Sequence, residues 1–460
     1  MSAATKKLYI KTWGCQMNVY DSRRMADVLR PLGYAESETP EGADMIILNT
    51  CHIREKATEK VFSEIGRLRV HKQAKEQDGD KMLLAVAGCV AQAEGDFILD
   101  RAKEVDIVFG PQTYHELPEM VLKASGMEGR PRIVNTDFPA ESKFDSLPEE
   151  HGSQGSAAFL SIQEGCDKFC TFCVVPYTRG AEFSRPMNKI VEEAHKLAEA
   201  GAVEITVLGQ NVNAYHGADG KGGTASLADL LYQLAEIPEI KRLRYTTSHP
   251  RDMDDDLITA HGEIEKLMPF LHLPVQSGSD KILKAMNRKH GRDRYFEIIE
   301  ALRKARPDLA LSSDFIVGFP GETDQDHADT MDLVRRVGFA SAYSFKYSPR
   351  PGTPAAVMQN LVREDVKSAR LQELQALLNE QQYDFNMKCE GLTMPVLFDR
   401  IGSENGQLLG RSPYNQSVHV NGNPRLKDQL LDVHFTHASP NAMTGDIVLV
   451  DGDVLAAAAE

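Results

Sequence analysis

The sequence predicts an α/β protein with three folded parts: an N-terminal doubly wound parallel sheet, a central partial (β/α)6 barrel of the TIM type, and a small C-terminal β-barrel. Apolar strands alternate with helical patterns over residues 8–347, which is typical of parallel sheets. Beyond a long helical stretch, residues 395–449 instead carry short strands separated by turns such as Asn421-Gly422. The 460 residues are also too many for one ordinary hydrophobic core, so several domains are expected.

The first domain, residues 1–138, repeats a strand–helix pattern. Each expected strand is a short apolar run, and the helices show apolar residues at helical spacing. The expected strands are 8–10, 45–48, 82–86 and 105–108, and the expected helices are 21–32 and 55–70. This alternation predicts a parallel sheet with helices on both faces.

Three cysteines occupy the same topological position in this domain. Cys15, Cys51 and Cys89 each follow the carboxyl end of an expected strand. That edge of an open α/β sheet is where ligands bind, and neighbouring strands are only about 4.8 Å apart. A single cysteine is often just a small buried hydrophobe, but three in equivalent positions favour a shared metal site. His52 is expected to be a loop residue rather than a ligand.

Residues 139–156 are rich in Glu, Ser, Pro and Gly and are expected to form a linker. Beyond them, the strand at 159–162 leads into a loop that carries Cys166, Cys170 and Cys173, spaced C-x3-C-x2-C. Three thiolates cannot complete a four-ligand metal site. On a [4Fe-4S] cluster they leave one iron open to a small molecule, and this spacing resembles that of radical S-adenosylmethionine (SAM) enzymes. A structural zinc site completed by a distant His or Cys is the alternative, which the strand and helix pattern disfavours.

The central domain, residues 157–383, is expected to contain six βα units. Its active face should lie where the carboxyl ends of the strands meet. The strands after the first are expected at 205–208, 243–245, 270–273, 309–317 and 341–347. Polar residues at those ends could contact ribose or substrate, or could only cap backbone groups: Gln210, Asn211, Ser248, His249 and Gln276.

Four residues are hypothesised to surround the adenine of SAM. Phe172, between the last two cysteines of the loop, would pack against the base. Ile316 and Val317 would form an apolar wall, and Gly318 would let the backbone approach the ligand closely.

Two three-cysteine sites in this order resemble the radical SAM methylthiotransferase family, and the resemblance covers nearly the whole chain. The run from Thr12 to Ser22, TWGCQMNVYDS, is similar to the tRNA-modifying MiaB type. The run from Asn49 to Ala57, NTCHIREKA, is also similar, although Ser-Val is commoner where His52-Ile53 stands. A later family run usually written R-G-R-E-x-S-R departs at Ala181, while Arg179 and Arg185 remain; their role stays open.

The resemblance implies an enzyme that transfers alkylthio groups, with two [4Fe-4S] clusters and SAM as cofactors. Cys166, Cys170 and Cys173 would hold the cluster at which SAM is cleaved to a 5′-deoxyadenosyl radical. The three earlier cysteines would hold the cluster that supplies sulfur. The implied reaction inserts a methylthio group at C2 of N6-isopentenyladenosine, at adenosine-37 beside the tRNA anticodon. The alternatives are threonylcarbamoyl-adenosine of tRNA or a ribosomal protein as substrate, and a noncatalytic RNA-binding protein with structural metal sites.

The remaining expectations concern the C-terminal part and the setting of the protein. Residues 384–452 would form a β-barrel like the TRAM domain of this family, with Arg400, Arg411 and Tyr414 as candidate RNA contacts, and residues 453–460 a disordered tail. Net charge is −15, which argues against a nonspecific nucleic-acid coat. No apolar run is long enough to cross a membrane and no signal peptide is evident, so a cytoplasmic protein is expected. A low-potential electron donor such as flavodoxin or ferredoxin and a monomeric state are further expectations.

Overall fold

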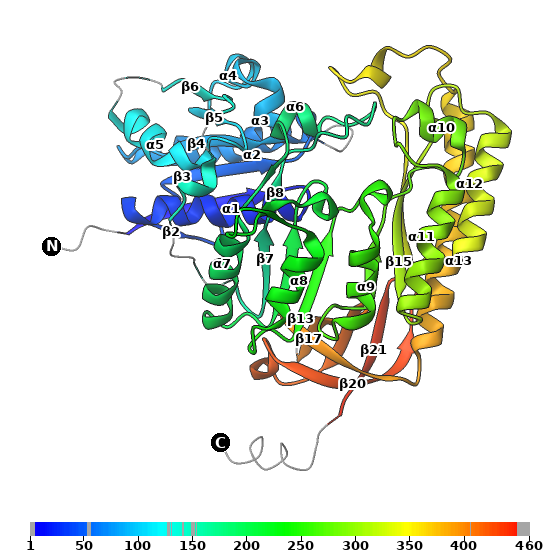
Figure 1. Cartoon of the computed structure of the whole chain (residues 1–460). Helices are drawn as coiled ribbons and strands as arrows, with labels where there is room; N and C mark the ends of the chain where they lie inside the picture. Colours follow the sequence, from blue (N-terminus) through cyan, green and yellow to red (C-terminus); the bar gives the residue numbers. More distant parts are fainter. Residues whose placement is uncertain are drawn as a thin grey trace, which may run out of the picture. The chain divides into compact units, whose positions relative to one another are not determined.

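The computed structural model describes two compact units within the chain (Figure 1). The N-terminal unit comprises Met1–Gly152, Gln163–Asp167 and Cys173–Arg185, and the C-terminal unit comprises Ser153–Ile162, Lys168–Phe172 and Pro186–Glu460. The described residues are 5–52, 57–126, 129, 131–139, 142–148, 152, 154–404 and 406–448. Residues 140–141, 149–151 and 153 of the expected linker, and all of the expected disordered tail at 453–460, lie outside them.

The N-terminal unit is built on the expected parallel sheet. Its strand order is β2-β1-β3-β4-β5-β6, and every described pairing in it is parallel. The strands are β1 (Lys6–Thr12), β2 (Tyr34–Glu36), β3 (Met45–Thr50), β4 (Leu83–Gly88), β5 (Ile107–Phe109) and β6 (Ile133–Asn135). The prediction of a doubly wound sheet is therefore confirmed. The sequence pattern missed β2 and β6, which are short edge strands without an apolar run.

Helices cover both faces of this sheet. One buried core joins the sheet to α1 (Gln16–Leu29) and α5 (Leu117–Gly126). The other joins it to α2 (Ala57–Gln77), α3 (Cys89–Glu94) and α4 (Asp96–Arg101). The expected helix at 55–70 thus extends further, and its first two residues lie outside the described part of the chain. Because both faces are covered, β3 and β4 are buried along their whole length.

Six parallel strands of the C-terminal unit confirm the predicted partial barrel (Figure 1). They form two three-stranded sheets, β13-β10-β7 and β14-β15-β16, linked by a parallel bridge between Leu243 and Leu267. The strands are β7 (Ala157–Ser161), β10 (Glu204–Leu208), β13 (Arg242–Thr246), β14 (Phe270–His272), β15 (Ala310–Val317) and β16 (Ser341–Lys346). The helices packed around them are α7 (Met187–Glu199), α8 (Leu227–Ala235), α9 (Asp255–Glu263), α11 (Arg292–Ala305), α12 (Asp324–Val337) and α13 (Glu364–Cys389).

The last part of the C-terminal unit is a closed barrel, as expected, with strand order β17-β18-β19-β21-β20. Its strands are β17 (Thr393–Ile401), β18 (Gln407–Arg411), β19 (Ser417–Asn421), β20 (Leu430–Ala438) and β21 (Ala442–Ile447). The last strand begins before the position expected from its apolar run, because β20 and β21 pair closely after a short turn. Cys389, at the end of α13, packs into the core of this barrel. Among the described residues, no helix is both long and apolar enough to span a bilayer.

Candidate iron–sulfur and cofactor sites

The structure brings Cys15, Cys51 and Cys89 to one edge of the N-terminal sheet. Cys15 caps the N-terminus of α1, Cys51 follows β3, and Cys89 is the first residue of α3. Their strands are neighbours in parallel register, which places the three carboxyl ends side by side. Gly14 has φ of +135°, and a Cβ there would lie 2.5 Å from Cβ of Cys51. Glycine is thus needed for the first thiol to approach the second.

Hydrogen bonding and charge couple these thiols. The hydrogen bond with Cys51 lowers the pKa of Cys15 to about 6. Cys15 Sγ also lies 3.3 Å from Oδ1 of Asn18, one turn into α1. Burial raises the pKa of Cys89, and the positive charge of Arg179 opposes that rise. The site therefore combines a polarised thiol with a nearby buried cation.

That cation belongs to a buried network of four charged side chains. Arg179 donates to Asp21 at 2.6 Å and to Glu164 at 2.9 Å. Lys143 donates to the same Glu164 oxygen at 2.6 Å and lies over the ring of Tyr114. Burial alone would lower the pKa of Arg179, but its acidic partners and the nearby thiols raise it well above the ordinary value. Arg179 is thus held inside the N-terminal unit, with 3% of its side chain exposed.

The donor set consists of three thiols at one edge of the sheet. Among the described residues, no group of three His, Cys, Asp or Glu side chains is placed to hold a single metal ion. On a [4Fe-4S] cluster each thiolate binds a different iron, so the three thiols need not share one metal atom. Cys15 in hydrogen-bond contact with Cys51, and in electrostatic contact with Cys89, suits three thiolates around such a cluster. The role of these three cysteines as ligands remains a prediction.

The second cysteine trio lies on one loop whose residues are divided between the two units. Cys166 and Cys173 belong to the N-terminal unit, and Cys170 belongs to the C-terminal unit. The backbone N–H of Cys166 donates to the carbonyl of Gly180 at 3.2 Å. The backbone N–H of Val175 donates to Sγ of Cys173 at 3.5 Å. The spacing of these thiols remains the argument that they share a cluster.

In the C-terminal unit, the sulfur of Cys170 faces Arg288, which the sequence did not single out. One guanidinium nitrogen of Arg288 lies 3.5 Å from this sulfur, and another donates to the carbonyl of Pro274 at 2.5 Å. Arg288 is 5% exposed and lies between Asn287 and Lys289, both with φ of +60°. Asn287 is of a residue type enriched in the left-handed region and Lys289 is not, so only one of the two positions carried a recognisable signal.

Of the four residues assigned to the adenine, two share a cluster of apolar side chains. Phe172 and Ile316 both pack against the group formed by Ile282, Met286, Phe319, Tyr347 and Ala355. Val317 points to the opposite face of β15, into the main core with the helices. Gly318 has φ of +70°, and a Cβ there would clash with Lys367. The adenine contacts remain predictions, and the placement supports Phe172 and Ile316 more directly than Val317.

The polar residues at the strand ends differ in how they are used. Asn211 donates to Asp252 at 2.8 Å, and Asp252 also pairs with Lys168 of the cysteine loop at 2.9 Å. Ser248 is 5% exposed, and its hydroxyl has no hydrogen-bond partner within the described part of the chain. The backbone of Gln276 has φ of +76°, and its carbonyl accepts the N–H of Ile316. Gln210 is half-buried. His249 mainly caps a short turn, where its ring accepts from Arg251 N–H.

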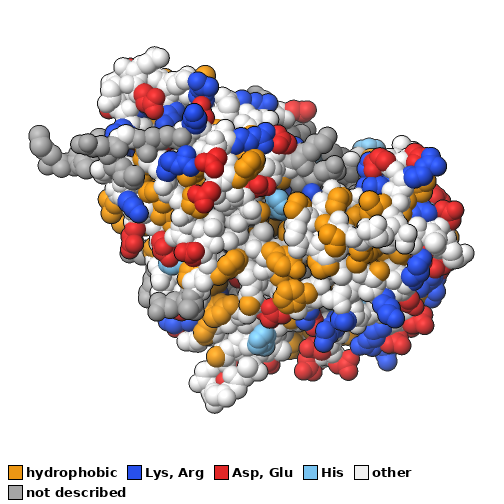
Figure 2. Space-filling model, turned by 90° about the horizontal axis from the view of Figure 1, so that it is seen from above, with side chains coloured by type: hydrophobic (Ala, Val, Ile, Leu, Met, Phe, Trp, Pro, Cys, Tyr) orange, Lys and Arg blue, Asp and Glu red, His pale blue; other side chains and the backbone are white. Residues whose placement is uncertain are grey.

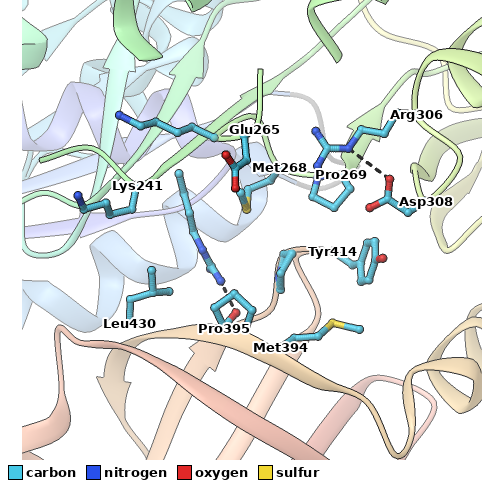
Figure 3. A pocket seen from close by; sticks show the side chains of 13 residues that line it. Lys241, Glu265, Met268, Pro269, Arg306, Asp308, Met394, Pro395, Tyr414 and Leu430 are labelled. Carbon is cyan, nitrogen blue, oxygen red and sulfur yellow. Dashed lines mark hydrogen bonds and ion pairs between the residues drawn. The ribbon is translucent and has the colours of Figure 1, made fainter. Parts of the chain in front are cut away.

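A cavity of about 510 Å³ lies elsewhere in the C-terminal unit, at the amino-terminal end of the barrel strands (Figure 3). The C-terminal barrel contributes Met394, Pro395 and Tyr414 to its lining. Arg306 pairs with Asp308 at 3.3 Å on the other side. Apart from Tyr414, a candidate RNA contact, none of the predicted site residues lines this cavity. The ring of Tyr414 packs edge-on against Phe385 beside the core of the C-terminal barrel. This contact occupies the ring, which therefore does not stack on a base.

Comparison with known proteins adds family assignments to this geometry. Residues 7–110 match the model of uncharacterized protein family UPF0004, and residues 160–334 match the radical SAM superfamily. The chain is 58% identical over 446 residues to a tRNA-2-methylthio-N(6)-dimethylallyladenosine synthase of Rickettsia rickettsii (strain Sheila Smith), covering 96% of this chain and 100% of that protein. The chain belongs to this synthase family. A Rickettsia felis member is equally similar, at 58% identity over the same length. The predicted family is thereby confirmed, and the radical SAM domain implies a [4Fe-4S] cluster and SAM.

Solved structures of other enzymes share the fold. The radical SAM methyltransferase TsrM from Kitasatospora setae matches with a TM-score of 0.55 at 12% identity, covering 77% of this chain and 74% of its own. The cobalamin-dependent radical SAM enzyme OxsB matches with a TM-score of 0.50 at 12% identity, covering 81% of this chain and 56% of its own. At this identity the likeness concerns the fold alone, and it agrees with the α/β architecture expected from the sequence.

Proposed function

We propose that this chain is a tRNA methylthiotransferase that inserts a methylthio group at C2 of N6-isopentenyladenosine beside the anticodon. The observation that carries the proposal is the 58% identity to named synthases over 96% of the chain. The two cysteine trios agree with it, because hydrogen removal and sulfur insertion are separate chemical tasks. Cys166, Cys170 and Cys173 would hold the cluster that, with SAM bound, supplies an adenosyl radical.

The second part of the proposal concerns the sulfur site. We assign Cys15, Cys51 and Cys89 to a second [4Fe-4S] cluster that supplies sulfur. Its support is the convergence of three strand ends and the contact between the first two thiols. The residues around it position the thiols: Gly14 permits close approach, and Arg179 places a buried positive charge beside thiolates that would otherwise be costly to bury.

The substrate proposal also fits the charge of the chain. Net charge is −15, and Lys and Arg side chains are interspersed with Asp and Glu on the face shown in Figure 2. Contact with tRNA would thus depend on local groups of cations, since exposed charges beyond about 8 Å are screened at physiological salt. The anticodon loop suits such an enzyme because its bases are already partly unstacked. Action in the cytoplasm, where tRNA lies, a monomeric state and a flavodoxin- or ferredoxin-type electron donor belong to the same proposal.

Nucleoside mass spectrometry of tRNA tests the proposal. A strain that lacks the gene should accumulate N6-isopentenyladenosine, and expression of this chain should convert it to the 2-methylthio derivative. Iron and acid-labile sulfide analysis of the purified protein should give two clusters per chain. Methylthiolation of threonylcarbamoyl-adenosine or of a ribosomal protein in place of this product would contradict the substrate assignment.

A further inference from the structure

Two large aromatic side chains of the barrel are exposed on a strand whose other residues are half-buried. Tyr343 and Phe345 of β16 are 63% and 50% exposed. Ala342, which precedes Tyr343, packs against the main core, and Lys346 pairs with Glu364 at the start of α13. Successive side chains of a strand point to opposite faces, so the two rings lie on the face away from α13.

The register of the neighbouring strand shows which surface this is. Tyr343 is paired with Asp314 of β15 and Phe345 with Ile316, so these four side chains share one face. Asp314 lies 3.6 Å from His272 of β14, and Ile316 packs against the apolar group that also contacts Phe172. The opposite face of β15 carries Phe315 and Val317, which are buried in the helix-covered core. The aromatic pair therefore lies on the inner face of the barrel. Phe345 stands beside Ile316, one of the residues predicted to contact the adenine of SAM.

Positive charge lies next to this face. Arg411, at the end of β18, is close enough to Tyr343, Arg400 and Arg244 for their charges to interact. Burial and the other two arginines lower the pKa of Arg411, and Asp399 only partly opposes them. Arg411 and Arg400 belong to the C-terminal barrel. Arg244 and Arg400 pair with Glu204 and Asp399, whereas Arg411 has no carboxylate partner among the described residues and donates to the carbonyl of Asn415. One guanidinium beside an exposed tyrosine suits an anionic, aromatic ligand rather than an apolar peptide.

We propose that Tyr343 and Phe345 stack on unpaired bases of the anticodon loop next to the target adenosine, with Arg411 contacting the adjacent phosphate. Residues two apart on a strand are about 6.6 Å apart, which is close to two steps of about 3.4 Å between stacked bases. Exposed aromatics on a strand face are a recurrent way to bind single-stranded RNA without reading its sequence. This inference rests on the proposed function, and it names the residues that hold the substrate.

The test uses the full chain with reconstituted clusters and a 17-nucleotide anticodon stem-loop RNA that carries N6-isopentenyladenosine. Binding is measured by fluorescence anisotropy at two salt concentrations. Tyr343→Ala and Phe345→Ala should each weaken binding about 5- to 150-fold, because stacking on one base contributes about 1–3 kcal/mol. Tyr343→Phe and Phe345→Tyr should stay within about twofold of wild type, since the ring is retained.

Salt dependence separates stacking from charge. The two alanine variants should keep the wild-type slope of log Kd against log salt, whereas Arg411→Gln should reduce it by about one. Tyr232→Ala is the matched control, because Tyr232 is an exposed tyrosine on α8 whose hydroxyl donates to Glu263. It should bind RNA as wild type does. The thermal unfolding midpoint should be unchanged in all variants of the aromatic pair.

Three results would overturn the inference. Wild-type affinity in both alanine variants would show that the rings do not touch RNA. An equal loss in Tyr343→Phe would assign the effect to the hydroxyl, and a loss confined to prenylated RNA would assign it to the isopentenyl group rather than to bases. Failure of the proposed function gives a separate result, because the wild-type protein would then form no methylthiolated nucleoside. That result does not depend on how tightly the variants bind RNA.

Discussion

Arg179 and Asp21 form a salt bridge of 2.6 Å in the interior of the N-terminal unit, with side chains 3% and 0% exposed. Asp21 lies on α1, which begins just after Cys15, and Arg179 ends the short helix α6 (Val175–Arg179) that follows Cys173. The pair therefore connects segments that carry one cysteine of each trio. This placement answers the question that the sequence left open for Arg179: its guanidinium is occupied by carboxylates rather than available to an RNA phosphate.

Arg179→Met should destabilise the N-terminal unit. The substitution leaves Asp21 and Glu164 buried near Lys143 alone, and breaking a buried pair typically costs about 3–5 kcal/mol. The measurement is a urea unfolding curve of the full chain. The control is Arg132→Met, which removes the exposed pair of Arg132 with Asp100 and should cost no more than about 1 kcal/mol. Equal shifts for the two variants would contradict a buried role for Arg179.

Substituting one cysteine from each trio should separate the two half-reactions. Cys166→Ala should stop formation of 5′-deoxyadenosine and of product, because the radical SAM cluster would lose a ligand. Cys51→Ala should retain SAM cleavage and abolish methylthiolation. Chromatography of 5′-deoxyadenosine and mass spectrometry of tRNA nucleosides measure the two outputs.

The control for that pair is Cys389→Ala, a buried thiol in the core of the C-terminal barrel that belongs to neither trio. It should retain both outputs. Methylthiolated tRNA formed by Cys51→Ala would contradict the assignment of Cys15, Cys51 and Cys89 as the sulfur site.

The local sequence patterns that predicted most of this fold could not predict its charge network. The cysteines after β1, β3 and β4 were recognisable because parallel strands bring their carboxyl ends to one edge. Arg179 is separated from Asp21 by 158 residues, so no local pattern joins them. The exposure of Tyr343 was equally hidden, because an aromatic in a strand usually indicates burial and only the register with Asp314 shows which face it occupies.

Arg288 should affect the redox behaviour of the radical SAM cluster. Its guanidinium lies 3.5 Å from Sγ of Cys170, and both the positive charge and an N–H···S contact favour the reduced form of a thiolate-bound cluster. Arg288→Gln should therefore make the cluster harder to reduce, and Arg288→Lys should have a smaller effect because it keeps the charge. A redox titration followed by electron paramagnetic resonance measures this. A potential unchanged in Arg288→Gln, with iron content intact, would show that the contact has no electronic role.

His261 should make the C-terminal unit sensitive to mild acid. It is fully buried against the hydroxyl of Tyr245 at 2.6 Å, and burial, with the charge of Arg306, lowers its pKa to about 3. In the unfolded chain an ordinary histidine titrates near 6.5. Between these two values only the unfolded state binds the proton, so this contribution to stability is complete above about pH 6.5 and is lost as pH falls towards 3.

Each buried neutral histidine of this kind changes the free energy of unfolding by up to about 1.4 kcal/mol per pH unit. Burial also lowers the pKa of His249 and His290, so the wild-type slope between pH 6.5 and 5 should reflect several groups. His261→Gln keeps a polar side chain beside Tyr245. It should reduce the pH dependence of the free energy of unfolding by the contribution of about one histidine. Urea unfolding midpoints at pH 7, 6 and 5 measure it, and parallel curves for variant and wild type would mean that His261 is protonated in the folded protein or stays neutral in both states.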